Sequence, residues 1–406
     1  MARSWAGWLG SPRIARATVA LIGLRVFYAY NWLDIGPALP AIGRTFGLTA
    51  IDWGYLVAAF LVGAALLQVP AGLLARRWGT RRVSLVGALL LGGSAVAIVV
   101  APNFATLLAL RVVSGAGAGL FFSPAIALVA SLHPEGSRGL PVGVFSSAFS
   151  AGAGLGVFAS AVLVPVIGWR DALALGGVVL LALLVVAERQ IPREAGGPPT
   201  PLARSPHPGA RLPAALRSPA VWAIGFAFMG LEGASLSSGQ YFVPYAQLVR
   251  GWNPVLAGAI GALFVVPSVF GGPVGGRLAE ERTNRRTQML LLTAGPGALL
   301  ALVPFAGIGG IAAIATTFSF AYGMVYAIMY ILPSYLPGLH LDDAPLAIGL
   351  FNGLQLGGGA MIAALVGATV GAFGYVVAFE LMAGLTVATL VMLAGVPATA
   401  ARANRP

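Results

Sequence analysis

Among the charged residues inside long apolar stretches of the sequence, four stand out for the chemistry they could do: Arg25, Asp34, Arg111 and Glu232. A charge surrounded by apolar groups is costly, so such a residue usually faces a polar interior or pairs with another residue. Glu232 lies near the middle of its stretch, where burial disfavours the charged form of a carboxyl group. It is our first candidate for a group that binds and releases a proton, and the alternative is an acid permanently paired with an arginine.

Arg25 and Asp34 share one apolar stretch that predicts a helix with two polar faces. Asp34 shares a face with Asn31, because helical residues repeat every three to four positions. Arg25 shares a different face with Tyr28 and Trp32. Arg25 and Asp34 can line one cavity only if the helix bends. Asp34 lies near the outer end, where we expect easier solvation, and it is the second candidate for the proton. Arg25, Tyr28 and Asn31 are candidates for ligand binding.

Arg111 opens the segment RVVSGAGAG, in which small residues follow a guanidinium group. We expect Arg111 to contact a ligand or a carboxylate in the interior, because a guanidinium group is costly in hydrocarbon. The alternative is that its long side chain extends to the outer surface. The glycines are expected to form a packing surface between helices.

The remaining candidates for ligand binding are polar or aromatic residues on the faces of expected helices: Gln240, Tyr322, Tyr326, Asn352 and Gln355. Tyr322 and Tyr326 begin a tyrosine stripe at helical spacing, which fits a binding cavity and also fits plain core packing. Asn352 and Gln355 share a face, where their amides could hold a ligand or bond a neighbouring helix.

The composition shows which elements must position these residues. The chain of 406 residues is 58% hydrophobic and 9% charged, with a mean hydropathy of +0.89, which excludes a soluble globular protein. Apolar stretches long enough to cross a bilayer number about twelve. They fall at 17–38, 51–75, 83–101, 104–132, 140–166, 171–188, 219–247, 254–278, 288–306, 309–336, 345–371 and 375–396.

The proline-rich segment 191–218 divides these stretches six and six. We therefore expect an all-α membrane protein with an N-terminal six-helix bundle at 1–190, a cytoplasmic linker at 191–218 and a C-terminal six-helix bundle at 219–406. The net charge of +12 does not indicate nucleic-acid binding, because the arginines stand in short clusters between the apolar stretches. Most fall on one side of the predicted topology, which places both termini in the cytoplasm of a multi-pass protein of the plasma membrane.

Internal repeats support two related halves. The segment GLLARRWGTRR at 72–82 is similar to GRLAEERTNRR at 276–286, and GVFSSAFSAGAG at 143–154 is similar to GLFNGLQLGGGA at 349–360. Each pair falls at corresponding positions of the two predicted bundles. Parallel repeats of six helices are typical of transporters with the substrate path between the halves.

The repeated loop resembles the signature of the major facilitator superfamily, a glycine followed by an acid, a second glycine and basic residues. Gly72, Arg77, Gly79 and Arg81 fit it in the first copy, in which Arg76 stands at the acid position. In the second copy, Glu280 supplies the acid and Arg285 a basic residue. The resemblance implies a twelve-helix fold and a cytoplasmic gate, in which the acid pairs with arginine to favour the outward-open state.

The segment from Asn31 to Asp34 resembles the anion:cation symporter branch of that family, and Ile35 replaces the arginine of the branch. The resemblance implies alternating access and proton-coupled uptake of a small organic anion. The same letters resemble proton-coupled drug exporters, so efflux of lipophilic or cationic compounds stays open, as do uniport and a non-transport role such as a sensor. The sequence has no phosphate-binding loop and no clustered nucleophile and base, so we do not expect an enzyme. We expect a monomer with no cofactor and no metal site, whose partners are a small-molecule substrate, protons and the bilayer.

Overall fold

The structure is a computed structural model that describes residues 11–134, 137–196, 214–281, 284–332, 336, 339 and 344–396. Regular secondary structure in these residues is entirely helical, and each of the twelve predicted spans coincides with one or more helices. Within the described residues, eight helical stretches are long and apolar enough to cross a membrane. The chain is an all-helical membrane protein, as the sequence predicted.

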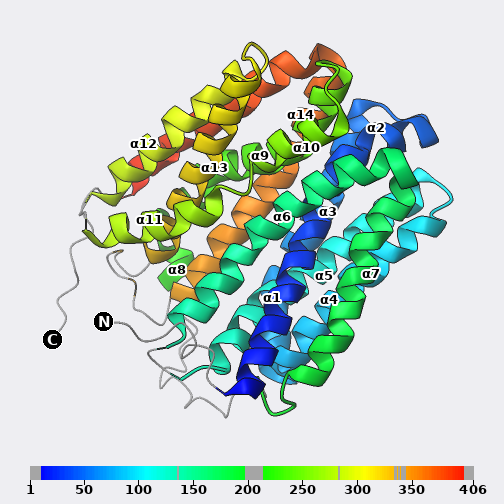
Figure 1. Cartoon of the computed structure of the whole chain (residues 1–406). Coiled ribbons are helices and arrows are strands. Elements are labelled where there is room, and N and C mark those ends of the chain that lie inside the picture. The colour runs from blue at the N-terminus through cyan, green and yellow to red at the C-terminus, as the bar shows by residue number, and fades with distance from the viewer. Residues whose placement is uncertain are drawn as a thin grey trace. The chain divides into compact units, whose positions relative to one another are not determined.

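The helices of the first half follow one another with short connections (Figure 1). They are α1 (Pro12–Leu33), α2 (Ile35–Phe46), α3 (Ala50–Trp78), α4 (Thr80–Ala97) with the 3-10 turn η2 (Ile98–Val100), α5 (Phe104–Ser131), α6 (Gly139–Ile167) and α7 (Trp169–Gln190).

The second half begins with a short helix within the predicted linker (Figure 1). Its elements are α8 (Ala214–Arg217), α9 (Pro219–Leu248), α10 (Pro254–Ala262), α11 (Ser268–Glu281), α12 (Arg285–Ala298) with η3 (Leu299–Leu302), α13 (Ile308–Ile331), α14 (Ala344–Ala388) and η6 (Thr389–Gly395).

Two predicted spans are divided in the structure. The span 17–38 is divided at Asp34 between α1 and α2, and α2 continues to Phe46. The span 254–278 is interrupted by turns at 263–267, because Pro267 has no N–H group to continue the helical bonds. The predicted break between the spans 345–371 and 375–396 is confirmed within α14 at Gly374, where a non-helical φ of 83° suits glycine.

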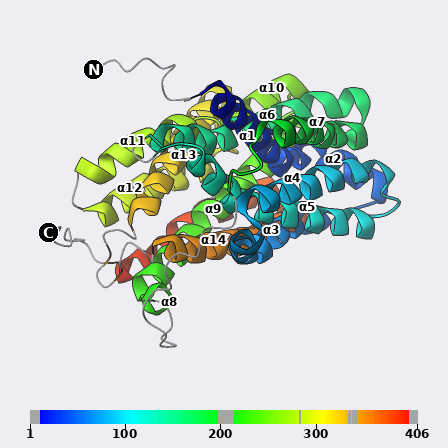
Figure 2. The same cartoon turned by 90° about the horizontal axis from the view of Figure 1, so that it is seen from below.

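The described residues divide into two compact units. Residues within 1–38 and 59–209 form the first, and residues within 39–58 and 210–406 form the second. In the first unit α1 packs against α6 and α7, and α4 packs against α5 and α7 (Figures 1 and 2). In the second unit α9 packs against α14, while α13 lies beside α11 and α12. The bundle boundaries at 190 and 218 stay a prediction.

Glycines permit the close packing of helices in the first unit. A side chain at Gly115 of α5 would collide with the carbonyl oxygen of Phe60 on α3, and one at Gly63 would collide with the carbonyl of Val112. Gly117 faces the backbone of α4 in the same way. The interpretation of GAGAG as a packing surface is therefore confirmed, since only glycine lets these backbones approach.

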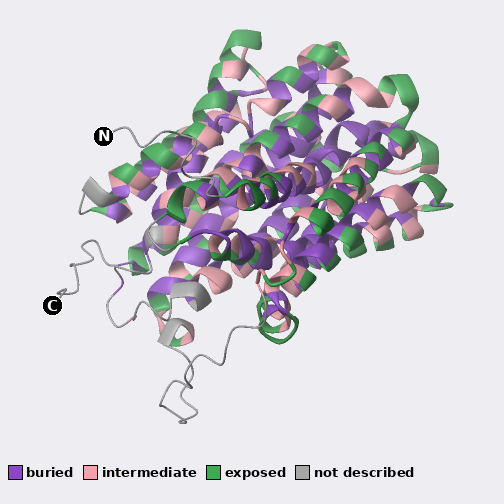
Figure 3. Ribbon diagram, turned by 60° about the horizontal axis from the view of Figure 1, so that its bottom comes forward, coloured by how far each residue is buried: buried purple, intermediate pink, exposed green. Residues whose placement is uncertain are grey.

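Exposed and buried residues alternate along the helices (Figure 3), and large apolar side chains are among the exposed ones. On α3, Leu66 is 64% exposed and Leu73 is 63% exposed. Exposure of such apolar side chains to water is unfavourable, whereas lipid chains solvate them. The charged residues that lie inside the units are therefore surrounded by protein on an apolar, lipid-facing scaffold.

Candidate functional site

Arg111 on α5 and Asp34 between α1 and α2 interact electrostatically inside the first unit. The guanidinium carbon of Arg111 lies 4.5 Å from the ring centre of Phe60, and its Nη1 donates to the carbonyl of Asn31 at 3.4 Å. Both charged side chains are 3% exposed. Among the described residues, Arg111 Nε and Nη2 and Asp34 Oδ1 have no hydrogen-bond partner. Arg111 therefore retains two N–H donors that a carboxylate can use.

Two expectations about these residues were wrong. Asp34 is not easily solvated, because α2 continues the chain directly after it and the side chain is buried at the junction of α1 and α2. The alternative in which Arg111 extends to the outer surface also fails, because α3 packs on α5 at that level and Phe60 covers the guanidinium group.

Arg25 on α1 lies in an aromatic cage. Its guanidinium carbon is 4.5 Å from the ring centre of Tyr28, 4.6 Å from Phe122, 5.5 Å from Phe145 and 4.9 Å from Phe149. Rings at these distances attract the cation through their π-electrons. The cage accounts for how a guanidinium group that is only 5% exposed is held inside the unit.

Stacked rings connect the two arginines. Tyr28 packs on Trp32 with ring centres 5.7 Å apart, and Trp32 meets Phe60 edge-on at 5.0 Å. Phe60 in turn lies under Arg111. We name this set of Arg25, Tyr28, Trp32, Phe60 and Arg111 the arginine–aromatic row.

The sequence interpretation missed most of the rings in this part of the unit. The sequence did place Trp32 on the helical face of Arg25 and Tyr28, but it did not single out Phe145 and Phe149, which stand four residues apart on α6. Such spacing places two rings on one helical face, which was the available signal. Phe60 gave no such signal, because only its contact with α5 brings it to Arg111.

The buried charged side chains of the first unit, among the described residues, are Arg25, Asp34 and Arg111. Arg25 lies in its aromatic cage, and Asp34 interacts with Arg111. The donor nitrogens of Arg111 that have no hydrogen bond are therefore the groups in this set that a bound carboxylate can use.

Glu232 on α9 lies inside the second unit and is 6% exposed. The hydroxyl group of Tyr322 on α13 donates to Glu232 Oε2 at 2.7 Å. No ion pair to Glu232 is present among the described residues, so the alternative of a paired acid receives no support there. Glu232 therefore has a neutral donor as its partner, and losing its charge would leave that hydrogen bond possible.

The tyrosine stripe of α13 continues from Glu232 toward α14. The rings of Tyr322 and Tyr326 stack with centres 5.4 Å apart, and Tyr330 donates to the hydroxyl of Tyr326 at 3.1 Å. The hydroxyl of Tyr330 also lies 3.0 Å from Asn352 Oδ1. Glu232, Tyr322, Tyr326, Tyr330 and Asn352 thus form one connected series, which we name the acid–tyrosine row.

The two remaining amides lie apart from this row. Gln355 of α14 donates through Nε2 to the sulfur of Met329 at 2.8 Å. Gln240 is 1% exposed, and its Oε1 has no hydrogen-bond partner among the described residues. No hydrogen bond joins either amide to Glu232 among the described residues, so their ligand-binding roles stay predictions.

The predicted gating residues of the first copy surround the turn from α3 to α4. Gly72 and Arg77 are exposed, and Gly79 adopts a φ of 85° that favours glycine. Arg81 forms an ion pair with Glu188 of α7 at 2.8 Å. In the second copy Arg285 is buried at the start of α12, and the side chain of Glu280 lies outside the described part of the structure. The gating role of all six residues stays a prediction.

A family model described as the Major Facilitator Superfamily matches residues 20–363. Two solved structures share the fold over nearly the whole chain. A bacterial homologue of the human lysosomal transporter Spinster, in an inward-facing and occupied conformation, has a TM-score of 0.75 and 18% identity, with 95% of each chain covered. A D-xylose–proton symporter has a TM-score of 0.73 and 17% identity, covering 95% of this chain and 98% of that one.

Curated relatives are distant and match parts of the chain. The 4-hydroxybenzoate transporter PcaK of Pseudomonas aeruginosa is 32% identical over 161 residues, or 40% of this chain and 36% of that protein. Human Monocarboxylate transporter 11 is 30% identical over 275 residues, covering 67% and 55%. The Puromycin resistance protein pur8 of Streptomyces alboniger is 29% identical over 185 residues, covering 45% and 36%. The chain thus matches about a third to a half of these proteins' lengths.

Proposed function

Because the chain belongs to the Major Facilitator Superfamily and is a secondary transporter, we propose that it carries a small aromatic carboxylate together with a proton. The observation that supports this most strongly is the buried guanidinium group of Arg111 inside the first unit. The Arg111 guanidinium group stacks on Phe60 and retains two unused N–H donors. A carboxylate accepts from such donors in pairs, and the neighbouring rings suit an aromatic substrate.

The names of several relatives agree with an organic anion as substrate. The 4-hydroxybenzoate, gallate and monocarboxylate transporters each act on a carboxylic acid, according to their names. An aromatic acid of that kind combines one negative charge with one ring. The arginine–aromatic row offers cations and rings side by side.

Glu232 is the group that we propose for the coupling proton. Asp34 interacts with the guanidinium group of Arg111, so loss of its charge would leave that cation without its acid. Glu232 instead accepts from the neutral hydroxyl of Tyr322. The second unit can therefore lose the charge of Glu232 without leaving a cation unpaired beside it. This supports Glu232 over Asp34 as the proton carrier during alternating access.

Proton-driven efflux of lipophilic or cationic compounds is the second candidate. The acid–tyrosine row supports it, because an acid beside stacked rings attracts organic cations. Puromycin and multidrug resistance proteins are also among the relatives. The first candidate requires an anionic substrate that contacts Arg111. The second requires a lipophilic or cationic substrate that contacts Glu232.

Transport into proteoliposomes decides between the candidates. With the outside acid, the wild-type protein should concentrate radiolabelled 4-hydroxybenzoate inside the vesicles. Arg111→Gln should weaken that uptake about ten- to a hundredfold, because it removes a charged hydrogen bond that contributes about 1.5–3 kcal/mol. Arg44→Gln, which alters an exposed arginine of α2, is the matched control and should retain uptake.

The opposite outcome is equally clear. If 4-hydroxybenzoate is not moved and ethidium is expelled in exchange for protons, the anion proposal is refuted and the efflux candidate stands. We also propose that both termini lie in the cytoplasm, and side-specific labelling of single-cysteine variants tests that placement.

A further inference from the structure

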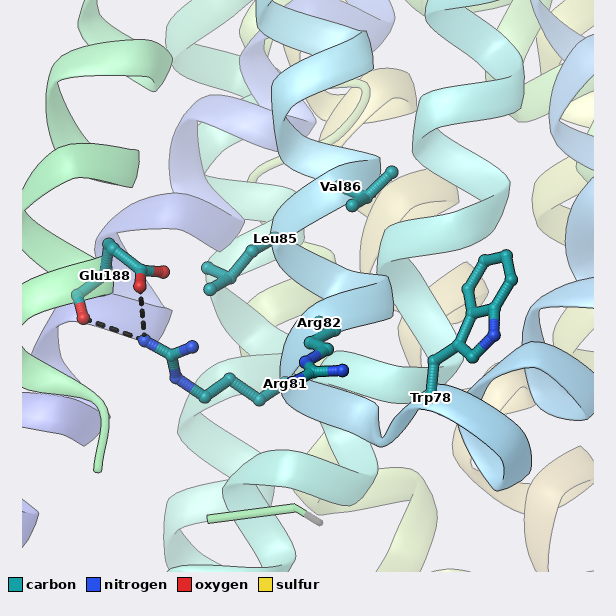
Figure 4. A pocket seen from close by; sticks show the side chains of 6 residues that line it. All are labelled: Trp78, Arg81, Arg82, Leu85, Val86 and Glu188. Carbon is teal, nitrogen blue, oxygen red and sulfur yellow. Dashed lines mark hydrogen bonds and ion pairs between the residues drawn. The ribbon is translucent and has the colours of Figure 1, made fainter. Parts of the chain in front are cut away.

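A groove lies on the outside of the first unit between α4 and α7. Its first part, about 530 Å³, is lined by Trp78, Arg81, Arg82, Leu85, Val86 and Glu188 (Figure 4). An adjoining part of about 320 Å³ shares Leu85, Val86 and Glu188 and adds Leu89, Leu184, Val185 and Arg189. Because the two parts share lining residues, they form one continuous surface, which we name the α4–α7 groove.

One end of the α4–α7 groove is positively charged. Arg81 Nη2 contacts Glu188 twice, at 2.8 Å to Oε1 and at 2.9 Å to the backbone carbonyl, which fixes the guanidinium group against α7 (Figure 4). Arg82 and Arg189 are exposed and have no ion pair or hydrogen bond with the described residues. Three guanidinium groups therefore stand against one carboxylate, and two of them remain available to an anion.

The other end of the groove is apolar and exposed. Val86 is 46% exposed, Leu89 is 53% exposed and Val185 is 52% exposed. These residues lie on α4 and α7, both of which are long and apolar enough to cross a membrane. The groove therefore runs from charges at the helix ends into the part of the surface that hydrocarbon covers. Trp78, 50% exposed at the charged end, is of the type that marks a membrane interface.

We propose that the α4–α7 groove binds one anionic phospholipid, with its phosphate at Arg82 and Arg189 and an acyl chain along Leu89 and Val185. Basic pockets beside apolar helix surfaces recognise anionic lipids through this combination of charge and hydrocarbon contact. A free phosphate would use the arginines but leave the apolar part uncovered, and a neutral lipid would leave the charge excess unmatched. This site is independent of the proposed substrate, because it shares no residue with the arginine–aromatic row.

Fluorescence quenching of the purified full-length protein tests the proposal. Brominated phosphatidylglycerol added to neutral-lipid nanodiscs should quench the indole of Trp78 in a saturable manner, and Trp78→Phe should remove that component. Arg82→Gln combined with Arg189→Gln should weaken the preference for phosphatidylglycerol over brominated phosphatidylcholine by about fivefold per arginine. Arg16→Gln combined with Arg76→Gln removes the same charge from exposed arginines outside the groove and should leave the preference unchanged.

Three outcomes would overturn the proposal. Equal quenching by the two brominated lipids would show that charge plays no part. An unchanged preference in the Arg82 and Arg189 double variant would place the lipid elsewhere. Competition by millimolar glycerol phosphate at the same strength as the lipid would identify a free phosphate site instead. Circular dichroism of each variant distinguishes loss of the site from loss of the fold.

Discussion

Replacing Glu232 with glutamine should uncouple transport from the proton gradient and leave the structure intact. Glutamine keeps a side-chain oxygen that can accept from Tyr322, which lies 2.7 Å from Glu232 Oε2. The hydrogen bond changes from a charged to a neutral one, a difference of about 1 kcal/mol. That is too small to unfold the protein, so the lost proton is the main consequence.

The size of the effect on accumulation follows from one carboxyl group carrying one proton. A gradient of one pH unit supplies about 1.4 kcal/mol per proton, which sustains about a tenfold accumulation of substrate. Without the proton, the internal and external concentrations should become equal. Exchange of labelled for unlabelled substrate should stay within about threefold of wild type, because exchange needs no net proton movement.

The assay compares both quantities in the same proteoliposomes. Glu380→Gln, which removes an exposed acid of α14, is the matched control and should accumulate substrate as the wild type does. If Glu232→Gln still concentrates substrate about tenfold, the reasoning is refuted, and Asp34→Asn becomes the next variant to examine. If exchange disappears together with accumulation, Glu232 contacts the substrate and does not act as a proton carrier alone.

Further expected outcomes concern stability and topology. Gly115→Ala should lower the free energy of unfolding by about 1–3 kcal/mol, because the added methyl group meets the backbone of α3. Gly93→Ala is the control and should have little effect, because the space beside Gly93 is open. Thermal unfolding in detergent measures both variants. Burial lowers the pKa of His133, so the unfolded state binds more protons than the folded state. The free energy of unfolding should therefore fall as the pH drops below about 6.5. His133→Gln should remove this pH dependence of the melting temperature. The natural sequence has no cysteine, so a membrane-impermeant thiol reagent should label Ser137→Cys only from the cytoplasm and Asn103→Cys only from outside. Reversed labelling would contradict the predicted orientation.

The sequence by itself determined the class of protein and the position of its helices. Long apolar stretches predict spans, because each backbone group in a bilayer must bond within its own helix. The breaks were harder to foresee. Proline at 267 ended a helix, but Pro124 lies within an uninterrupted α5, since neighbouring helices decide whether the local backbone continues.

The sequence also identified several side chains of the candidate site, because a charge inside an apolar stretch stands out in any composition. It did not identify their partners. Arg111 meets the carbonyl of Asn31, 80 positions away, and Tyr322 meets Glu232, 90 positions away. Helical periodicity fixes which face a residue occupies, whereas the neighbouring helix on that face depends on packing of the whole unit. Only the tertiary structure therefore decided that Phe60 covers Arg111, that Asp34 is buried, and that Glu232 bonds to a tyrosine instead of an arginine.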